Sequence, residues 1–283
     1  MQKSQLFVIA AALIAVFSLY VFGRTVPPQQ AKAASPVMPA TAPMAGNAVK
    51  AADFSTLLQQ AKGKIPPVKL MEITTLENSV VRGDVKEQQI KAYRQLASVW
   101  DSLMQGPVAA HYLGEAAKLE NSEKSLTFAA NLFLNYLQHT DDESVRKWES
   151  NEAVDLLQKA QALDPKNDTI KVAIANAQVQ GGDVMDGVQQ LLAVIREDSD
   201  NVDANLLLGK LSVTSGQYDK AIERLENVIA KSPDNAEAIY FLAISFREKG
   251  DNAKAITYFE RCKAVVKNPD FGKEIDSLVN TIQ

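Results

Sequence analysis

A spacing of 34 residues recurs through the second half of this 283-residue chain. Three series of similar residues keep it: Gly182, Gly216 and Gly250; Gly187, Ala221 and Ala255; and Leu191, Leu225 and Phe259. A fixed period of this length is typical of a repeat array, in which each unit packs only against its neighbours. Arrays of this kind usually bind other proteins rather than catalyse reactions, so the period predicts an architecture and a class of function without naming a partner.

Residues 202–235 show what one period encodes. Apolar residues at helical spacing predict one helix over Ala204–Thr214 and a second over Tyr218–Ala230. Gly216 lies between the two, where glycine adopts a positive φ without a steric penalty. Pro233 follows the second helix and stops it, because proline cannot continue the hydrogen-bond ladder. Each unit is therefore predicted to be a helical hairpin.

The order of small and large residues in these units resembles the tetratricopeptide repeat (TPR) family. The residues that carry the resemblance are Leu208, Gly209, Gly216, Tyr218, Ala221, Leu225, Val228 and Pro233 in one unit, and Leu242, Ala243, Phe246, Gly250, Ala255, Phe259 and Cys262 in the next. Three units keep register without a gap over residues 168–269. The resemblance implies an all-α, right-handed solenoid of helical hairpins that binds proteins; the alternative is an unrelated helical bundle with chance periodicity.

Upstream of residue 168 the period loosens, and residues 51–167 are predicted to form degenerate helical repeats. The expected helices are Leu70–Val81, Ile90–Met104, Pro107–Glu120, Ser122–His139 and Asn151–Pro165. Thr140–Lys147 is expected to be a connector longer than the usual turn. Residues 270–283 carry an apolar stripe and are predicted to form a C-terminal capping helix, because a last repeat otherwise exposes its apolar face. The expected array has about five units.

Near the N-terminus, Leu6–Phe22 contains no charged residue and spans roughly 26 Å as a helix, close to the lower limit for crossing a membrane. We interpret residues 1–24 as a membrane anchor. The alternative is a cleaved signal peptide, with Ala31-Lys32-Ala33 as the cleavage pattern, which predicts a secreted repeat protein.

Residues 25–50 hold five prolines and no apolar periodicity, which predicts a disordered tether. The anchor and the tether together indicate a membrane-anchored bacterial TPR protein. It would be a single-pass protein of the cytoplasmic membrane with a periplasmic repeat domain.

The charge distribution argues against nucleic acid as a ligand. The net charge is −4, and residues 1–50 hold four basic and no acidic residues, so residues 51–283 carry −8. No basic stripe is present, whereas nucleic-acid binding needs clustered Lys and Arg. The single cysteine, Cys262, excludes an internal disulfide and is expected to be a small core residue.

We find no motif for a catalytic, cofactor or metal site, and the chain is predicted not to be an enzyme. Two histidines, His111 and His139, and one cysteine do not match a familiar zinc spacing, and both histidines are expected on helix surfaces. The alternative is a hydrolase or transferase with its site in the irregular region 53–120. The candidates there are Glu72, Glu77, Asp84, Glu87, His111 and Glu115. A cleft in which His111 faces a carboxylate would favour that alternative.

The resemblance places the binding surface in the groove lined by the first helix of each unit. The candidate groove residues are Val172, Asn176, Leu206, Lys210, Val213, Tyr240, Ile244 and Arg247. The family's carboxylate-clamp residues are not reproduced, so a peptide with apolar anchors is the expected ligand. The predicted role is a scaffold or chaperone-like adaptor for a protein or peptide partner. Self-association through the capping helix or the N-terminal units is a further interpretation.

Overall fold

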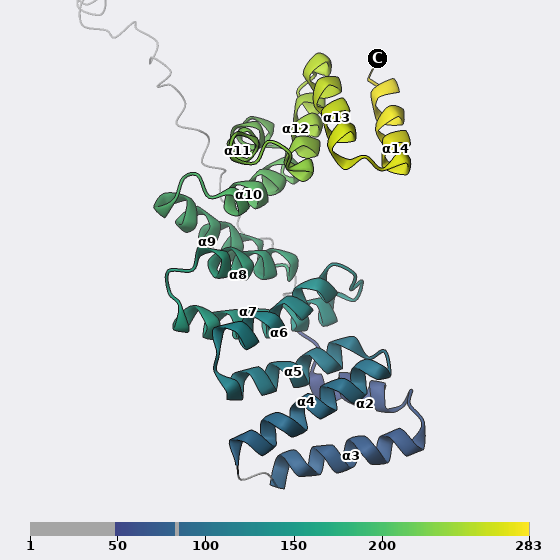
Figure 1. Ribbon diagram of the computed structural model, residues 1–283. Coiled ribbons are helices and arrows are strands. Elements are labelled where there is room, and N and C mark those ends of the chain that lie inside the picture. Colours follow the sequence, from purple (N-terminus) through teal and green to yellow (C-terminus); the bar gives the residue numbers. More distant parts are fainter. Residues whose placement is uncertain (1–48, 83–84, 283) are drawn as a thin grey trace, which may run out of the picture. The chain divides into compact units, whose positions relative to one another are not determined.

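The computed structural model describes residues 49–82 and 85–282, and these residues form only helices (Figure 1). The helices are α2 (Phe54–Lys62), α3 (Pro67–Arg82), α4 (Lys86–Ser102), α5 (Gly106–Glu120), α6 (Glu123–Leu137), α7 (Glu143–Leu163), α8 (Asp168–Gln180), α9 (Val184–Glu197), α10 (Val202–Thr214), α11 (Tyr218–Lys231), α12 (Ala236–Glu248), α13 (Asn252–Val266) and α14 (Pro269–Asn280). The predicted anchor over residues 1–24 and the tether up to residue 48 lie outside the described residues. Within the described ranges, no helix has the length and apolar character needed to span a bilayer.

Successive helices pair into hairpins that stack in chain order (Figure 1). The hairpins are α4–α5, α6–α7, α8–α9, α10–α11 and α12–α13, with α2 and α3 before them and α14 after them. The expectation of an all-helical array of helical hairpins with a C-terminal capping helix is therefore confirmed for the described residues.

The 34-residue period has a direct structural counterpart. The three turn glycines have positive φ angles, 93° at Gly182, 71° at Gly216 and 79° at Gly250. The three large residues of the second helices, Leu191, Leu225 and Phe259, are each 0 % exposed. Each first helix also begins on an asparagine whose side chain accepts a backbone N–H three residues later: Asn167, Asn201 and Asn235. The period thus sets the helix start, the turn and the main core residue of every unit.

Small residues allow close packing inside the hairpins. A methyl group placed on Gly209 would lie 2.8 Å from the Leu225 side chain, so α10 and α11 pack with no room for a larger residue. Cys262 is buried in α13, where its thiol donates to the Ala236 carbonyl at 3.4 Å. The sequence-based expectation that Cys262 is a core residue is confirmed.

Helix α7 is longer than predicted, because it begins at Glu143 rather than at Asn151. The prediction of a long connector over Thr140–Lys147 is therefore wrong. Asp142 caps the helix by accepting the backbone N–H groups of Ser144 and Val145 at 2.8 and 3.2 Å. The added turns pack against the α8–α9 hairpin, where Lys147 pairs with Asp183. Residues 143–150 are therefore helical and contact the following unit, instead of forming a loop.

Residues 49–62, which include α2, form an N-terminal strap that the sequence did not predict. The Ala52 N–H donates to the Ser144 carbonyl at 2.9 Å, and the Phe54 ring stacks on His111 of α5 with ring centres 3.6 Å apart. Lys62 at the end of α2 pairs with Glu77 of α3 at 2.7 Å. The strap therefore packs on α5 and α7, which are second helices of their hairpins.

Candidate functional site

The first helices α6, α8, α10 and α12 present equivalent positions to one surface. Their N-cap residues are Ser122, Asn167, Asn201 and Asn235. The fifth residue after each cap is Thr127, Val172, Leu206 or Tyr240; the sixth is Phe128, Ala173, Leu207 or Phe241; and the ninth is Asn131, Asn176, Lys210 or Ile244. These positions follow one another at helical spacing, so each helix contributes one stripe of side chains to this surface.

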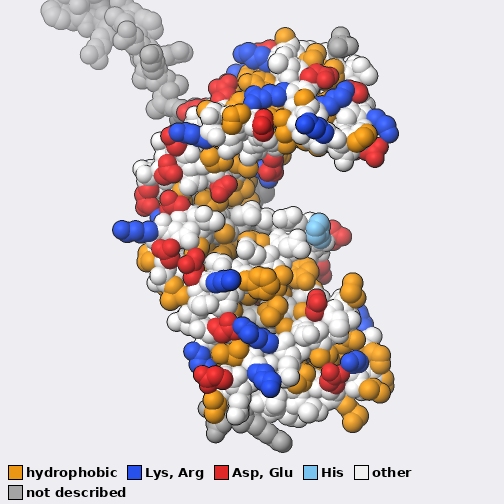
Figure 2. All heavy atoms as spheres, in the orientation of Figure 1, with side chains coloured by type: hydrophobic (Ala, Val, Ile, Leu, Met, Phe, Trp, Pro, Cys, Tyr) orange, Lys and Arg blue, Asp and Glu red, His pale blue; other side chains and the backbone are white. Residues whose placement is uncertain are grey.

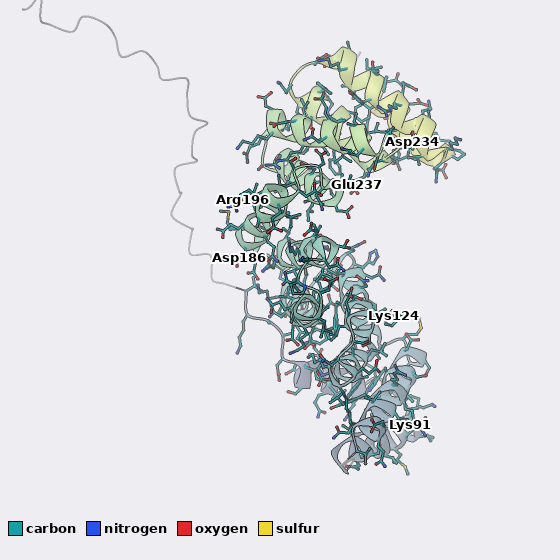
Figure 3. All side chains as sticks on the ribbon, turned by 60° about the vertical axis from the view of Figure 1, so that its left-hand side comes forward. Lys91, Lys124, Asp186, Arg196, Asp234 and Glu237 are labelled. Carbon is teal, nitrogen blue, oxygen red and sulfur yellow. The ribbon has the colours of Figure 1, made fainter. Side chains whose placement is uncertain are left out.

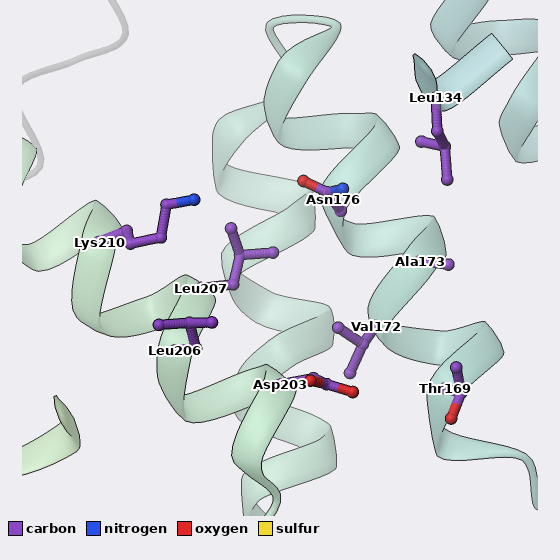
Figure 4. Close-up of a pocket in the computed structure, with 9 residues that line it drawn as sticks. All are labelled: Leu134, Thr169, Val172, Ala173, Asn176, Asp203, Leu206, Leu207 and Lys210. Atoms are coloured by element: carbon purple, nitrogen blue, oxygen red, sulfur yellow. The ribbon is translucent and has the colours of Figure 1, made fainter. Parts of the chain in front are cut away.

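A pocket of about 260 Å³ lies on this surface between α6, α8 and α10 (Figure 4). Its lining residues are Leu134, Thr169, Val172, Ala173, Asn176, Asp203, Leu206, Leu207 and Lys210. Four of the eight candidate groove residues, Val172, Asn176, Leu206 and Lys210, are therefore brought together in one pocket. Figure 4 shows Lys210 and Asn176 toward one end of the pocket and Asp203 and Thr169 toward the other.

Some polar side chains of this pocket already have partners within the protein, and others do not. Lys210 forms an ion pair with Glu237 of α12 and lies 5.7 Å from the centre of the Phe241 ring. The Asn176 amide oxygen accepts a hydrogen bond from Gln180 at 3.0 Å. Asp203 is exposed and has no ion pair within the described ranges. The pocket thus combines an apolar floor with an amide, a hydroxyl and an unpaired carboxylate.

The other four candidates pack largely against their neighbours; Val213 lies at the end of α10, and Tyr240, Ile244 and Arg247 lie in α12. The Tyr240 ring centre is 6.0 Å from that of Phe259 and 6.3 Å from that of Phe271 on the capping helix. Val213 and Ile244 are half-buried against the core of the same region. Arg247 donates to the adjacent carboxylate of Glu248 at 2.7 and 3.0 Å. The role of all eight residues in binding stays a prediction.

Sequence analysis missed five residues of the pocket: Leu134, Thr169, Ala173, Asp203 and Leu207. Ala173 and Leu207 come directly after the predicted positions Val172 and Leu206, and Thr169 and Asp203 lie one turn earlier. The signal was available in the N-cap asparagines, because counting from Asn167 or Asn201 locates the whole stripe. Leu134 belongs to the irregular unit, where no such register could be read.

Of the residues of the enzyme alternative, Glu72 lines a hollow of about 380 Å³ together with Leu76, Gln95 and Val99, but neither His111 nor a second candidate acid belongs to its lining. The His111 Nδ1 atom lies 3.5 Å from Oε1 of Glu152 on α7, and the two side chains are only 15 % and 17 % exposed. His111 lies under the Phe54 ring, so the expectation that it sits on a helix surface is wrong. Burial opposes ionisation of Glu152, but His111 and Lys118 outweigh it and hold the pKa of this carboxyl below its usual value.

The remaining acids of that region make local pairs. Glu77 accepts from Lys62 at 2.7 Å and from the Tyr112 hydroxyl at 3.1 Å. Glu72 pairs with Lys69 at 2.8 Å, and Glu115 with Lys118 at 2.9 Å. Glu87 is exposed, and Asp84 lies outside the described residues. No group of three or more His, Cys, Asp or Glu side chains suited to a metal occurs in the described part of the chain.

One carboxyl group is buried without forming an ion pair to any described residue. Glu149 of α7 is 0 % exposed, and neither of its oxygens has a hydrogen-bond partner among the described residues. Burial raises the pKa of Glu149 to about 7, while Thr140 and Arg146 partly offset this effect. The neighbouring Ser150 hydroxyl, in contrast, donates to the Ala177 carbonyl at 2.8 Å. Glu149 is therefore a group whose charge opposes folding.

Surface charge on the visible face of the described residues is mixed. Figure 2 shows acidic and basic side chains interspersed among hydrophobic ones, with no continuous basic stripe on that face. A surface of this kind suits contact with a protein better than contact with a phosphate backbone.

Comparison with known proteins supports the repeat assignment. Residues 206–265, which span most of α10–α13, match the tetratricopeptide repeat family. This segment is therefore similar in sequence to tetratricopeptide repeats. The chain is 28% identical over 110 residues to a probable UDP-N-acetylglucosamine–peptide N-acetylglucosaminyltransferase SEC of Arabidopsis thaliana. It is 26% identical over 147 residues to cellulose synthase 1 operon protein C of Komagataeibacter xylinus. The matches cover 39% and 48% of this chain but only 11% of each relative.

Two solved structures align with much of this chain at low identity. MamA from Desulfovibrio magneticus RS-1 aligns over 66% of this chain and 98% of its own, with 20% identity and a TM-score of 0.47. A tetratricopeptide repeat protein from Parabacteroides merdae aligns over 81% of this chain and 93% of its own, with 13% identity and a TM-score of 0.46.

Proposed function

We propose that this protein is a non-enzymatic scaffold whose first helices bind a protein or peptide partner. The observation that carries the proposal is the pocket between α6, α8 and α10, in which Val172, Asn176, Leu206 and Lys210 meet. Tetratricopeptide repeats generally serve protein–protein interaction, which supports the same class of role. No catalytic role is included, because His111 and Glu152 are closed off by Phe54.

The pocket suits an extended or helical segment with apolar side chains. Val172, Leu206 and Leu207 supply apolar surface, and Asn176 retains amide hydrogens able to meet a backbone carbonyl. Lys210 is held by Glu237 and Phe241, so it acts as a fixed wall of the pocket rather than as a free cation. Recognition would therefore depend on apolar anchors more than on a terminal carboxylate.

Site-specific photo-crosslinking in cells tests this function. A photoreactive residue at Leu207 lines the pocket, and one at Ala193, which is exposed on the second helix α9, is the matched control. We expect a discrete protein adduct from position 207, its loss when Leu206→Asp is added, and no such adduct from position 193. Equal adducts from both positions would show that the first helices are not the binding surface.

We further propose that the scaffold is tethered to the cytoplasmic membrane through Leu6–Phe22, with the repeat domain in the periplasm. The support is the uncharged apolar run and the proline-rich residues 25–50 that follow it. Protease treatment of spheroplasts tests this placement. We expect the repeat domain to be degraded without lysis; protection until the membrane is disrupted would exclude a periplasmic location.

A further inference from the structure

A second hollow lies on the same surface of first helices, between α4, the end of α5 and α6. It consists of two adjoining spaces of about 540 and 320 Å³ that share Arg94, Glu120, Ser125 and Phe128. The deeper floor is apolar, since Leu113, Ala116 and Ala117 of α5 line it. Hydroxyl and amide side chains form the rim on α6: Ser122, Ser125, Thr127 and Asn131.

Phe128 is the unusual residue of this hollow, because its side chain is 58 % exposed. The equivalent positions in the following units are Ala173, Leu207 and Phe241, and all three are half-buried. A solvent-exposed phenylalanine ring lacks the stabilisation that burial normally gives to a large apolar side chain. Exposed aromatic side chains beside an apolar pocket are typical anchors for a partner.

Two basic residues, Arg94 and Lys124, line the hollow together with this aromatic side chain, and Lys91 lies one turn before Arg94 on α4. Arg94 pairs with Glu120 at 2.7 Å, yet its side chain stays 61 % exposed. Lys91 and Lys124 are exposed and have no ion pair among the described residues. Figure 3 labels both lysines on the same side of the N-terminal half of the array. Among the described residues that line the hollow, Glu120 is the one acid, and Arg94 balances it, so Lys124 leaves the rim with excess positive charge.

The charges differ between this hollow and the pocket at α8–α10. There, Lys210 is paired with Glu237, and the unpaired charge is the carboxylate of Asp203. A ligand segment with carboxylates is therefore attracted to the hollow at α4–α6 and repelled by Asp203. The two sites on this surface therefore favour ligand segments of different charge.

We propose that the hollow at α4–α6 binds a partner segment in which carboxylates flank a large apolar side chain. The apolar side chain would lie against Phe128 over the floor formed by Leu113 and Ala117. The carboxylates would meet Arg94 and Lys124. This inference rests on the proposed function, since it names the chemistry of the partner at one part of the same binding surface.

Binding of labelled synthetic peptides to the full chain in non-ionic detergent tests the inference. The probe is a fluorescein-labelled Asp-Asp-Gly-Leu-Phe-Gly-Asp-Asp peptide; one control has Lys for Asp, and another has Gly for Leu-Phe. Fluorescence anisotropy measures each affinity at low and at physiological salt. We expect the acidic probe to bind at least about tenfold more tightly than either control, and less tightly as salt rises.

Variants locate the binding site of the probe. We expect Phe128→Ala and Lys124→Glu each to weaken the acidic probe by about tenfold. Lys220→Glu changes the same charge on α11, where Lys220 is exposed and forms a hydrogen bond with Gln217, and it should leave the affinity unchanged. All the substituted side chains are exposed, so circular dichroism should show an unaltered fold. Unchanged affinity in Phe128→Ala, or equal binding of the Lys-containing peptide, would overturn the inference.

The outcome is separable from that of the proposed function. If the photoreactive residue at Leu207 captures a partner but the acidic probe does not bind, only the inference about the Phe128 hollow fails. If the probe binds in a Phe128-dependent manner while position 207 captures nothing, the α8–α10 pocket is not the partner-binding site. The inference about the Phe128 hollow then still holds.

Discussion

Replacing Glu149 by glutamine tests how the buried carboxyl of α7 affects folding. The Glu149 side chain is fully buried with no hydrogen-bond partner among the described residues, and burial raises its pKa to about 7 from 4.5. In the unfolded chain the same carboxyl regains its ordinary pKa. The folded state therefore binds this proton more tightly than the unfolded state does.

The sign of the pH dependence follows from this difference. Between pH 4.5 and about 7 the folded state carries more protons than the unfolded state, so the free energy of unfolding falls as pH rises. Below pH 4.5 the group is protonated in both states and its charge imposes no penalty. Since one pKa unit corresponds to about 1.4 kcal/mol, the full penalty at pH 8 is roughly 3 kcal/mol. Glu149→Gln removes the charge and with it this penalty.

Urea unfolding of the full chain in non-ionic detergent, followed by circular dichroism at pH 4.5 to 8, measures the effect. We expect Glu149→Gln to be more stable than the parent protein by roughly 2–3 kcal/mol at pH 8 and nearly equal to it at pH 4.5. Glu226→Gln, an exposed acid without an ion pair on α11, is the matched control and should show no such divergence. Parallel pH profiles for Glu149→Gln and the parent would refute the reasoning.

Three further substitutions test the packing and capping of the repeats by the same unfolding assay. Gly209→Ala should lower the free energy of unfolding by about 1–2 kcal/mol, because the new methyl group meets Leu225 at 2.8 Å; unchanged stability would contradict this close approach. Asn235→Ala should cost about 1 kcal/mol, because the Ala238 N–H loses its acceptor, and Asn235→Asp should restore most of it. Phe259→Ala should cost about 3–5 kcal/mol at a fully buried site, and a loss below 1 kcal/mol would argue against a packed core there.

Most of the fold could be predicted where the period is regular. The interval of 34 residues carries the turn glycine and the buried residue of the second helix together, so the helices predicted at residues 204–214 and 218–230 match α10 and α11 to within two residues. The N-terminal part could not be read in this way. The first turns of α7 hold only two apolar residues, Val145 and Trp148, among polar and charged ones. The Asp142 cap, the packing of Trp148 on Phe133 and the contact with the α8–α9 hairpin stabilise them as helix.

The binding surface was predictable in part for a similar physical reason. Val172 and Leu206 were found because the repeat register locates the first-helix stripe, and the pocket contains both. Tyr240 has the same register, but the capping helix places Phe271 beside it, which sequence spacing alone does not show. Phe128 lies in an irregular unit, and its exposure depends on how far α4 and α6 are apart.

The strap that joins Ala52 to Ser144 and Phe54 to His111 determines where mechanical load enters the repeat domain. A pull applied at residue 49 reaches α7 and α5 first, and both belong to the layer of second helices. No residue of the strap lines the α8–α10 pocket or the hollow around Phe128. Traction on the chain therefore acts away from the α8–α10 pocket, but it acts directly on α5, which supplies Leu113, Ala116 and Ala117 to the floor of the hollow around Phe128.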